Sequence, residues 1–277
     1  MTGFLEEMAT ASGARVAAAR ARESAVALER RALATPPAPR LALRPQGLDV
    51  IAEIKLRSPA AGVLGDAGGD WLERAKLYAR AGAAAVSVLT EPTRFDGALE
   101  HLAAAAAALR AFDVPVMRKD FLVDPYQVFE ARANGAGGVL LILRMLSAMQ
   151  YGELIEAACA QGLFVLLEAF DAPELELAGE LSRAHAARGT LLAGLNCRDL
   201  QSLAVVPERF AQLAPVLPAG VTTVAESGVD TPADALRLQR QGYRVVLVGS
   251  ALMACADPAG WIGEALRASR TGRTQTG

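Results

Sequence analysis

Two opposite charges lie two residues apart at the end of an apolar stretch. In the segment DVIAEIK, residues 49–55, Glu53 and Lys55 stand where a buried strand would run into a core. Side chains of a strand alternate between its two faces, so Glu53 and Lys55 share one face. Buried charges are costly unless they are paired or used. The pair predicts either a structural ion pair or acid–base chemistry, and these two residues alone do not decide between them.

Further charged residues follow apolar runs later in the chain. Lys119 lies near the end of the run 114–120, and Glu168 near the end of the run 163–170. Lysines and carboxylates in one cavity of low polarity shift each other's pKa values, so that a lysine can act as a general acid and a glutamate as an acid or a base. Other polar residues at such run ends are Arg118, Asp120, Asn196, Arg198, Glu226, Ser227 and Ser250.

The elements that must position these residues alternate regularly. Short apolar runs, each followed by a helical pattern, predict eight strands, at 49–55, 84–90, 114–120, 137–143, 163–170, 190–196, 221–227 and 244–250. Eight strand–helix units in about 220 residues are typical of an α/β protein with a (β/α)8 barrel, the TIM barrel. An open doubly wound sheet alternates in the same way, but the number of units favours the barrel, and no GxGxxG follows the first strand. In a barrel the carboxyl ends of all strands meet at one mouth, where active sites lie.

The rest of the chain flanks this barrel. Residues 1–48 are predicted as an N-terminal helical extension, with one helix over 4–34 that TPPAP at 35–39 ends. The barrel is expected over residues 49–269. The polar tail, 270–277, is predicted to be disordered.

The composition excludes several classes of function. The 28 Lys and Arg residues nearly balance the 30 Asp and Glu residues, so neither a nucleic-acid partner nor a membrane surface is expected. Cys159, Cys197 and Cys255 show no CxxC spacing, which argues against disulfides and zinc and favours a reducing cytoplasm. The N-terminus has no signal-peptide pattern, and no run reaches the ~20 apolar residues of a membrane span. His101 and His185 fall in predicted helices of the outer ring and are not expected to be catalytic.

Small residues follow the last two predicted strands. Ser227 and Gly228 end one of them, and Gly249 and Ser250 end the other. Small residues let backbone amides approach a ligand, and TIM barrels often bind phosphate here, at the N-terminus of a short extra helix. Residues 250–253 could form that helix. The alternative is that these residues only serve tight turns.

Asn196 and Arg198 close the sixth predicted strand. Their side chains suit hydrogen bonding to hydroxyls or a carboxylate of a substrate. The alternative is that Asp199 holds Arg198 and the group only orders the loop. Cys197 between them has no histidine partner nearby in the sequence, so a packing role is expected rather than a nucleophile.

Seven motifs occur in order along the chain: AEIKLRSP, SVLTEPTRFDG, RKDFLVDPYQVFEARANGA, LLEAF, GLNCRDL, VAESGV and VLVGSALM. Together they resemble the indole-3-glycerol phosphate synthase family of tryptophan biosynthesis. The resemblance runs from about residue 12 to residue 265, with the helical extension included, and the RKDF–DPYQ block is highly specific. The resemblance implies a carboxy-lyase that converts 1-(2-carboxyphenylamino)-1-deoxyribulose 5-phosphate to indole-3-glycerol phosphate, carbon dioxide and water.

The resemblance also implies roles at matching positions. Lys119 would be the general acid that polarises the ketone, and Glu168 the proton-transfer partner in dehydration. Lys55 would pair with the substrate carboxylate, Glu53 would orient Lys55, and Asn196 would complete the catalytic set. Substrate-binding residues would be Arg198, Glu226, Phe95, Phe121 and Ser58, and phosphate-binding residues Ser227, Gly228, Gly249 and Ser250. No metal or organic cofactor is implied, and a monomer is expected.

The chain departs from the family pattern after the first strand. Leu56-Arg57 and Ala60-Ala61 stand where the family commonly has a basic or small pair and a Ser-Lys pair, and the glycine-rich segment 65–70 is expected to be mobile. Two alternatives therefore stay open. One is a related phosphosugar reaction in which Lys119 or Lys55 forms a Schiff base. The other is a divergent paralogue that acts on, or only binds, a related phosphosugar or a pathway partner.

Overall fold

The predicted barrel is present. The structure is a computed structural model that describes residues 3–58, 62–63, 70–199, 202 and 204–271. Eight parallel strands close into a barrel in the order β1-β10-β9-β8-β7-β6-β5-β4. They are β1 (Asp49–Ile54), β4 (Ala85–Leu89), β5 (Val116–Lys119), β6 (Gly138–Ile142), β7 (Phe164–Ala169), β8 (Leu191–Asn196), β9 (Thr223–Glu226) and β10 (Val245–Val248). Each lies within one of the predicted runs, and the (β/α)8 class is confirmed.

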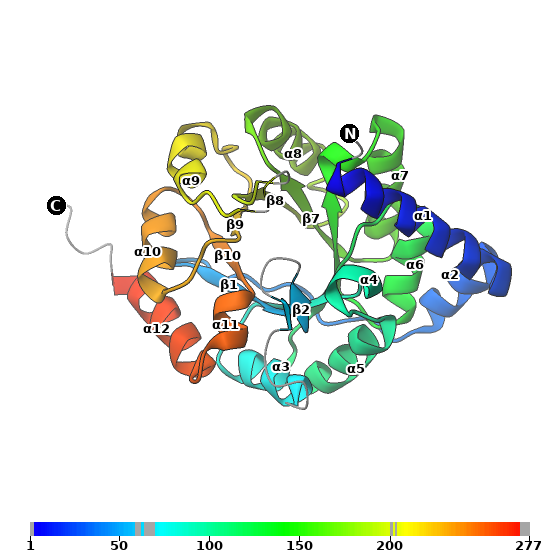
Figure 1. The fold of residues 1–277 in the computed structure, drawn as a ribbon, viewed down its shortest axis with the longest axis horizontal. Helices are drawn as coiled ribbons and strands as arrows, with labels where there is room; N and C mark the ends of the chain where they lie inside the picture. Colours follow the sequence, from blue (N-terminus) through cyan, green and yellow to red (C-terminus); the bar gives the residue numbers. More distant parts are fainter. Residues whose placement is uncertain (1–2, 59–61, 64–69, 200–201, 203, 272–277) are drawn as a thin grey trace.

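Helices surround this barrel, as Figure 1 shows. The main ones are α3 (Trp71–Arg80), α5 (Leu99–Leu109), α6 (Pro125–Ala133), α7 (Ala148–Ala160), α8 (Ala172–Ala184), α9 (Glu208–Leu213), α10 (Pro232–Arg240) and α12 (Pro258–Thr271). Most begin at a side chain that caps the first turn, and these capping residues are Asp70, Asp124, Ser147, Asp171 and Thr231. Shorter elements are α4 (Pro92–Phe95), α11 (Ser250–Ala254), the pair β2 (Arg57–Ser58) and β3 (Gly62–Val63), and the 3-10 turns η1 (Arg110–Phe112), η2 (Leu143–Met145) and η3 (Ala214–Val216).

The alternation of each strand separates two cores. Val50 and Ala52 of β1 point outward and pack with the surrounding helices. Ile51, between them, points inward, where it joins apolar residues of the other strands such as Met117, Leu166, Leu192 and Val224. The inward positions that follow along these strands are therefore directed at the mouth of the barrel, above an apolar floor.

The N-terminal extension is two helices, so the prediction of one helix over residues 4–34 was wrong in this detail. Helix α1 spans Phe4–Arg22 and α2 spans Ala25–Ala34. The break follows from Ser24, which has extended backbone angles and whose hydroxyl accepts a hydrogen bond from the Ala27 amide at 3.2 Å, starting a new helix. Both helices pack beside α6, through a small cluster that includes Val16, Leu28 and Tyr126.

Some predictions fall on residues outside the described ranges. These are the Ala60-Ala61 departure, the mobility of the glycine-rich segment except for Asp70, and the disorder of residues 272–277. Arg57, the other departure, is described: its guanidinium lies 3.5 Å from the Asp96 carboxylate, with both side chains about half exposed. Helix α12 continues to Thr271, past the predicted end of the barrel at residue 269.

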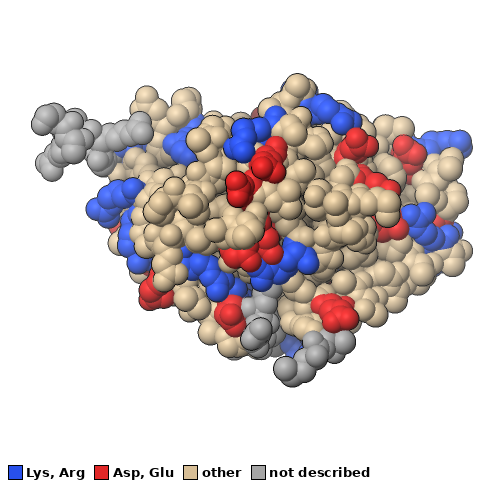
Figure 2. Space-filling model, turned by 90° about the horizontal axis from the view of Figure 1, so that it is seen from above, with Lys and Arg blue, Asp and Glu red and all other residues tan. Residues whose placement is uncertain are grey.

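The surface carries charges of both signs. On the face seen in Figure 2, Lys and Arg side chains lie among Asp and Glu side chains, with no extended field of one sign. This pattern agrees with the near-neutral balance of the sequence. Within the described residues, no helix has both the length and the apolar character that a membrane span requires.

Candidate active site

A cavity of about 230 Å³ opens at the carboxyl ends of the barrel strands. It collects residues that are far apart in the sequence but were all predicted to belong to one site. Thirteen of the fourteen predicted site residues line it: Glu53, Lys55, Phe95, Lys119, Phe121, Glu168, Asn196, Arg198, Glu226, Ser227, Gly228, Gly249 and Ser250. The fourteenth, Ser58, lies in β2 with its backbone paired to Gly62, and its side chain is outside what the structure describes.

Alternation along the strands explains which charged residues reach the cavity. Lys119 follows the inward Met117 on β5 and faces the cavity. Arg118, between them, faces outward, where its guanidinium contacts the carboxylates of Asp120 at 3.2 Å and Glu130 at 3.1 Å. Arg118 was one of the polar run-end residues of the sequence, and the structure places it behind the barrel wall.

Glu53 lies between the two lysines of the site. Its Oε1 is 3.3 Å from Lys55 Nζ, and its Oε2 is 3.5 Å from Lys119 Nζ. Burial alone would raise the pKa of Glu53, but Lys119 and Lys55 outweigh it and hold this pKa below its ordinary value. Burial alone would likewise lower the pKa of Lys119, but the carboxylates of Glu53, Glu168 and Glu226 raise it above its ordinary value. The site therefore holds a charged lysine and an ionised glutamate side by side.

Glu168 and Asn196 form a second pair across the cavity. Asn196 Nδ2 donates to Glu168 Oε1 at 2.9 Å, while Asn196 Oδ1 accepts from the Arg198 amide at 2.9 Å. The Asn196 side chain therefore links Glu168 to the loop after β8. Burial raises the pKa of Glu168 above its ordinary value, although Lys119 and the Asn196 hydrogen bond work in the opposite direction. Glu168 is thus suited to take up and release a proton.

Glu226 is the most buried carboxylate of the cavity, with 1% of the residue exposed. Neither of its carboxylate oxygens has a hydrogen-bond partner. Burial and the nearby charge of Glu168 raise the pKa of Glu226 well above its ordinary value. Glu226 therefore keeps its proton to a higher pH than an ordinary glutamate does.

This preference predicts a pH-dependent effect of Glu226→Gln on stability. A group whose pKa is higher in the folded than in the unfolded protein stabilises the fold fully at pH values below its unfolded pKa. This contribution is lost as the pH rises through its folded pKa. Glutamine does not titrate, so the free energy of unfolding of the variant, relative to that of the wild type, should be higher at about pH 8 than at about pH 5. Urea unfolding at both pH values measures the gain. A difference between the two proteins that does not change with pH would contradict the assignment.

Two glycines make room for the buried carboxylates. A Cβ at Gly194 on β8 would collide with Glu226 Oε1 and lie 2.9 Å from Leu166 Cδ1, and a Cβ at Gly249 would collide with Glu53 Oε1. The buried carboxylates therefore require glycine, without a side chain, at positions 194 and 249.

Gly194→Ala tests this requirement. Overpacking the barrel interior should lower the free energy of unfolding by about 1–3 kcal/mol, measured by urea unfolding. The control is Gly152→Ala in α7, where nothing lies within 4 Å of the added methyl group. Alanine there should raise the free energy of unfolding by about 0.5–1 kcal/mol, because glycine is unfavourable inside a helix. Equal effects at both positions would refute the steric account.

The small residues after β9 and β10 take unusual backbone conformations. Ser227 and Gly228 both have positive φ, at 68° and 63°. For serine this conformation costs of the order of 1–3 kcal/mol and is typical of functional sites. Gly249 precedes the short helix α11, which begins at Ser250. The predicted short helix at residues 250–253 is thus confirmed.

Several residues of the cavity were not predicted from the sequence. Phe4 and Leu5 come from α1, and Leu140, Ile142 and Phe170 come from β6 and the end of β7. The sequence analysis considered polar residues at strand ends, so the inward apolar positions of β6 were missed although their alternation would have indicated them. No local signal connects Phe4 or Leu5 with the mouth of the barrel.

The described part of the chain contains no group of three His, Cys, Asp or Glu side chains that could hold a metal ion. Cys197 is buried, and burial raises the pKa of its thiol to about 11, so the thiol form is favoured over the nucleophilic thiolate. The charged side chains that line this cavity are those of Glu53, Lys55, Lys119, Asp120, Glu168, Arg198, Glu226 and Asp230.

Fold and cavity together define a (β/α)8-barrel enzyme with an acid–base site of lysines and glutamates at the carboxyl ends of its strands. The family model for indole-3-glycerol phosphate synthase matches residues 5–264. The indole-3-glycerol phosphate synthase of Parafrankia sp. (strain EAN1pec) is 43% identical over 254 residues, which cover 91% of each chain. That of Nocardioides sp. (strain ATCC BAA-499 / JS614) is 46% identical over 244 residues, covering 86% of this chain and 90% of the relative. The chain belongs to the indole-3-glycerol phosphate synthase family.

A solved structure supports the fold independently. Thiamine phosphate pyrophosphorylase from Pyrococcus furiosus superimposes with a TM-score of 0.55, covering 80% of this chain and 96% of that one. The sequences are 16% identical, so this likeness concerns the barrel alone.

Proposed function

We propose that the chain is an indole-3-glycerol phosphate synthase of tryptophan biosynthesis. It converts 1-(2-carboxyphenylamino)-1-deoxyribulose 5-phosphate to indole-3-glycerol phosphate, carbon dioxide and water. The ring carbon that carries the carboxylate forms a bond to the ketone carbon, the carboxylate leaves as carbon dioxide, and the former ketone oxygen leaves as water. The observation that carries the proposal is that Lys119 and Glu168 face one cavity of a chain from this family, with Glu53 beside Lys119.

Lys119 is the general acid of this proposal. It donates a proton to the ketone oxygen as the new carbon–carbon bond forms, and so stabilises the negative charge that develops there. The carboxylate of Glu53, 3.5 Å from Lys119 Nζ, favours the protonated lysine that this step needs. A Schiff base would need the neutral amine of the lysine. The raised pKa of Lys119 therefore disfavours a Schiff base at Lys119.

Glu168 moves protons during dehydration. It takes the proton that must leave the ring system as water departs, and Asn196 holds the Glu168 carboxylate in place for this step. Lys55, 3.3 Å from Glu53, pairs with the substrate carboxylate until carbon dioxide leaves. Arg198 and Glu226 line the same cavity and bind polar groups of the substrate.

The two ends of the substrate are assigned to opposite sides of the cavity. Phe95 and Phe121, with ring centroids 6.2 Å apart, pack against the aromatic ring. Ser227, Gly228, Gly249 and Ser250 bind the phosphate through backbone amides and hydroxyls. A monomeric enzyme in the cytoplasm, without nucleic-acid or membrane partners, completes the proposal.

Indole fluorescence tests the proposed reaction. The purified chain, mixed with carboxyphenylamino-deoxyribulose phosphate, should produce the fluorescence of indole-3-glycerol phosphate. The same substrate without its phosphate should react with a much larger KM, because the residues assigned to the phosphate have nothing to bind. Binding of the phosphorylated compound without any product would refute the proposal and favour a divergent paralogue that only binds.

A further inference from the structure

The chain that leaves β5 is held by the N-terminal helix. Lys119 is the last residue of β5, and Asp120 and Phe121 follow it directly. Arg15 of α1 forms an ion pair with Asp120, and Phe4 of α1 packs edge-on against the ring of Phe121, with centroids 5.8 Å apart. A helix more than 100 residues away in sequence therefore contacts both residues that follow the proposed catalytic lysine.

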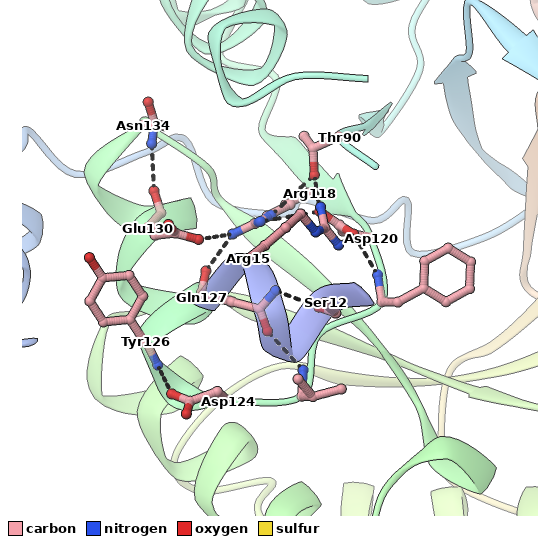
Figure 3. Close-up of polar contacts among 12 residues, drawn as sticks. Ser12, Arg15, Thr90, Arg118, Asp120, Asp124, Tyr126, Gln127, Glu130 and Asn134 are labelled. Carbon is pink, nitrogen blue, oxygen red and sulfur yellow. Dashed lines mark hydrogen bonds and ion pairs between the residues drawn. The ribbon is translucent and has the colours of Figure 1, made fainter. Parts of the chain in front are cut away.

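Asp120 is the centre of these contacts (Figure 3). Arg15 donates to both of its oxygens, at 2.7 Å to Oδ1 and 3.0 Å to Oδ2. Oδ1 also accepts from the Phe121 amide at 2.8 Å, and Oδ2 accepts from the Thr90 hydroxyl at 2.7 Å and from Arg118 at 3.2 Å. The Asp120 side chain is fully buried, so these charge-assisted bonds are stronger than the same bonds would be in water.

The same contacts connect Asp120 to the backbone of Lys119. The Thr90 amide donates to the Lys119 carbonyl at 3.0 Å, while the Thr90 hydroxyl donates to Asp120. The Phe121 amide donates a hydrogen bond to the Asp120 carboxylate itself. A displacement of the Asp120 carboxylate would therefore be transmitted to the peptide groups on both sides of it, and to the direction in which Lys119 leaves β5.

A second contact of α1 is with the first turn of α6. The Gln127 side chain donates to the Ser12 hydroxyl of α1 at 2.8 Å and accepts from the Val123 amide at 2.9 Å (Figure 3). Helix α1 thus contacts both the segment that follows β5 and the start of α6, and the contact with Asp120 is the one next to Lys119.

Another ion pair of α1 serves as an internal comparison. Arg20 binds Asp124 at 2.7 Å, but both side chains are substantially exposed, at 43% and 31%, and Asp124 caps the start of α6. Exposed ion pairs contribute little to stability. The Arg20 pair anchors the same helix to the same loop, but none of its contacts reaches Lys119, Asp120 or Phe121.

We propose that Arg15 and Asp120 are positioning residues: through their ion pair, helix α1 fixes the end of β5 and thereby the direction of the Lys119 side chain. The extension then contributes to turnover as well as to the cavity wall that Phe4 and Leu5 form. This inference rests on the general-acid role proposed for Lys119.

Arg15→Gln, compared with Arg20→Gln, tests the proposal. A misplacement of a catalytic group by about 1 Å can cost about a hundredfold in rate, so Arg15→Gln should lower kcat by about tenfold to a hundredfold. Arg20→Gln should change kcat by less than about twofold. Arg15→Lys keeps the charge but loses the two-point contact, so its kcat should lie between those of the wild type and Arg15→Gln. Circular dichroism shows whether each variant is folded. If Arg15→Gln does not fold, the test is whether Arg15→Lys has a lower kcat than Arg20→Gln.

Hydrogen exchange gives a readout that does not need activity. In Arg15→Gln the Phe121 amide, which Asp120 holds, should exchange faster by about tenfold, and in Arg20→Gln it should be unchanged. If both variants raise only KM and leave kcat and the Phe121 amide unchanged, α1 is merely a wall of the cavity and the proposal is wrong. A wild type without synthase activity would instead refute the proposed function, and the exchange at Phe121 would still decide whether Arg15 fixes this segment.

Discussion

Lys119→Ala is expected to lower kcat by about a hundredfold to ten-thousandfold, the usual effect of losing a positioned general acid. The alanine variant has no proton donor beside the ketone oxygen, and Lys55 is directed at the other oxygen of Glu53. Removing Lys119 also leaves Glu53 with one positive neighbour in place of two. Steady-state rates of indole-3-glycerol phosphate formation, measured at saturating substrate, give the change in kcat.

A matched lysine controls for the loss of a charge. Lys76 on α3 forms an exposed ion pair with Glu73 at 2.5 Å, away from the cavity. Lys76→Ala should leave kcat within about twofold of the wild type, because exposed pairs of this kind contribute little. If Lys119→Ala also stayed within that range, the proton would have to come from another group and the role assigned to Lys119 would be wrong.

Glu168→Gln is expected to lower kcat by a similar factor, about a hundredfold to ten-thousandfold. Glutamine keeps the shape of the side chain but cannot exchange a proton, so the effect isolates the acid–base role from packing. The pKa of Glu168 is raised, so wild-type kcat should fall, as the pH is lowered, at a higher pH than an ordinary glutamate would cause. The residual activity of Glu168→Gln should lack this fall.

The matched glutamate control is Glu156 on α7. Its carboxylate is 3.4 Å from Arg188, and both side chains are more than half exposed. Glu156→Gln should keep the kcat and the pH profile of the wild type. A Glu168→Gln variant that kept the acidic limb of the profile would show that another group, with Glu226 as the first candidate, titrates there.

Local patterns were sufficient to predict the fold. The eight apolar runs coincide with the eight barrel strands because a strand buried on both faces must be nearly continuously apolar. Glycines with positive φ follow several helices, at Gly82, Gly135, Gly162 and Gly242. The wrong prediction of one helix over residues 4–34 also has a local cause. It took no account of Ser24, whose hydroxyl caps the start of a second helix.

The site could be predicted as a set of residues, but not as a geometry. The rule that strand ends share one mouth was enough to bring Glu53, Lys119 and Glu168 together. Their pairing depends on distances between strands that the sequence does not contain. Glu53 forms ion pairs with Lys55 and Lys119, and Asn196 donates a hydrogen bond to Glu168. These contacts form only when the strands close into the barrel.

Contacts between distant segments were the hardest to predict. Arg15 lies on a helix rich in Ala, Arg and Glu, and nothing in that composition distinguishes it from Arg20 or Arg22. Its partner Asp120 was visible only as one of several polar run-end residues. The ion pair between Arg15 and Asp120 depends on where the extension crosses the barrel, which is a tertiary property.

Quantifying carbon dioxide and indole-3-glycerol phosphate from the same reaction tests the central claim most directly. With substrate labelled in its carboxyl group, the wild type should release labelled carbon dioxide and form indole product in equal amounts, because one cavity closes the ring, removes the carboxylate and completes dehydration. Carbon dioxide without indole product would mean that the cavity decarboxylates but that Lys119 and Glu168 do not complete the ring. Neither product, with the phosphorylated substrate bound, would contradict the account as a whole.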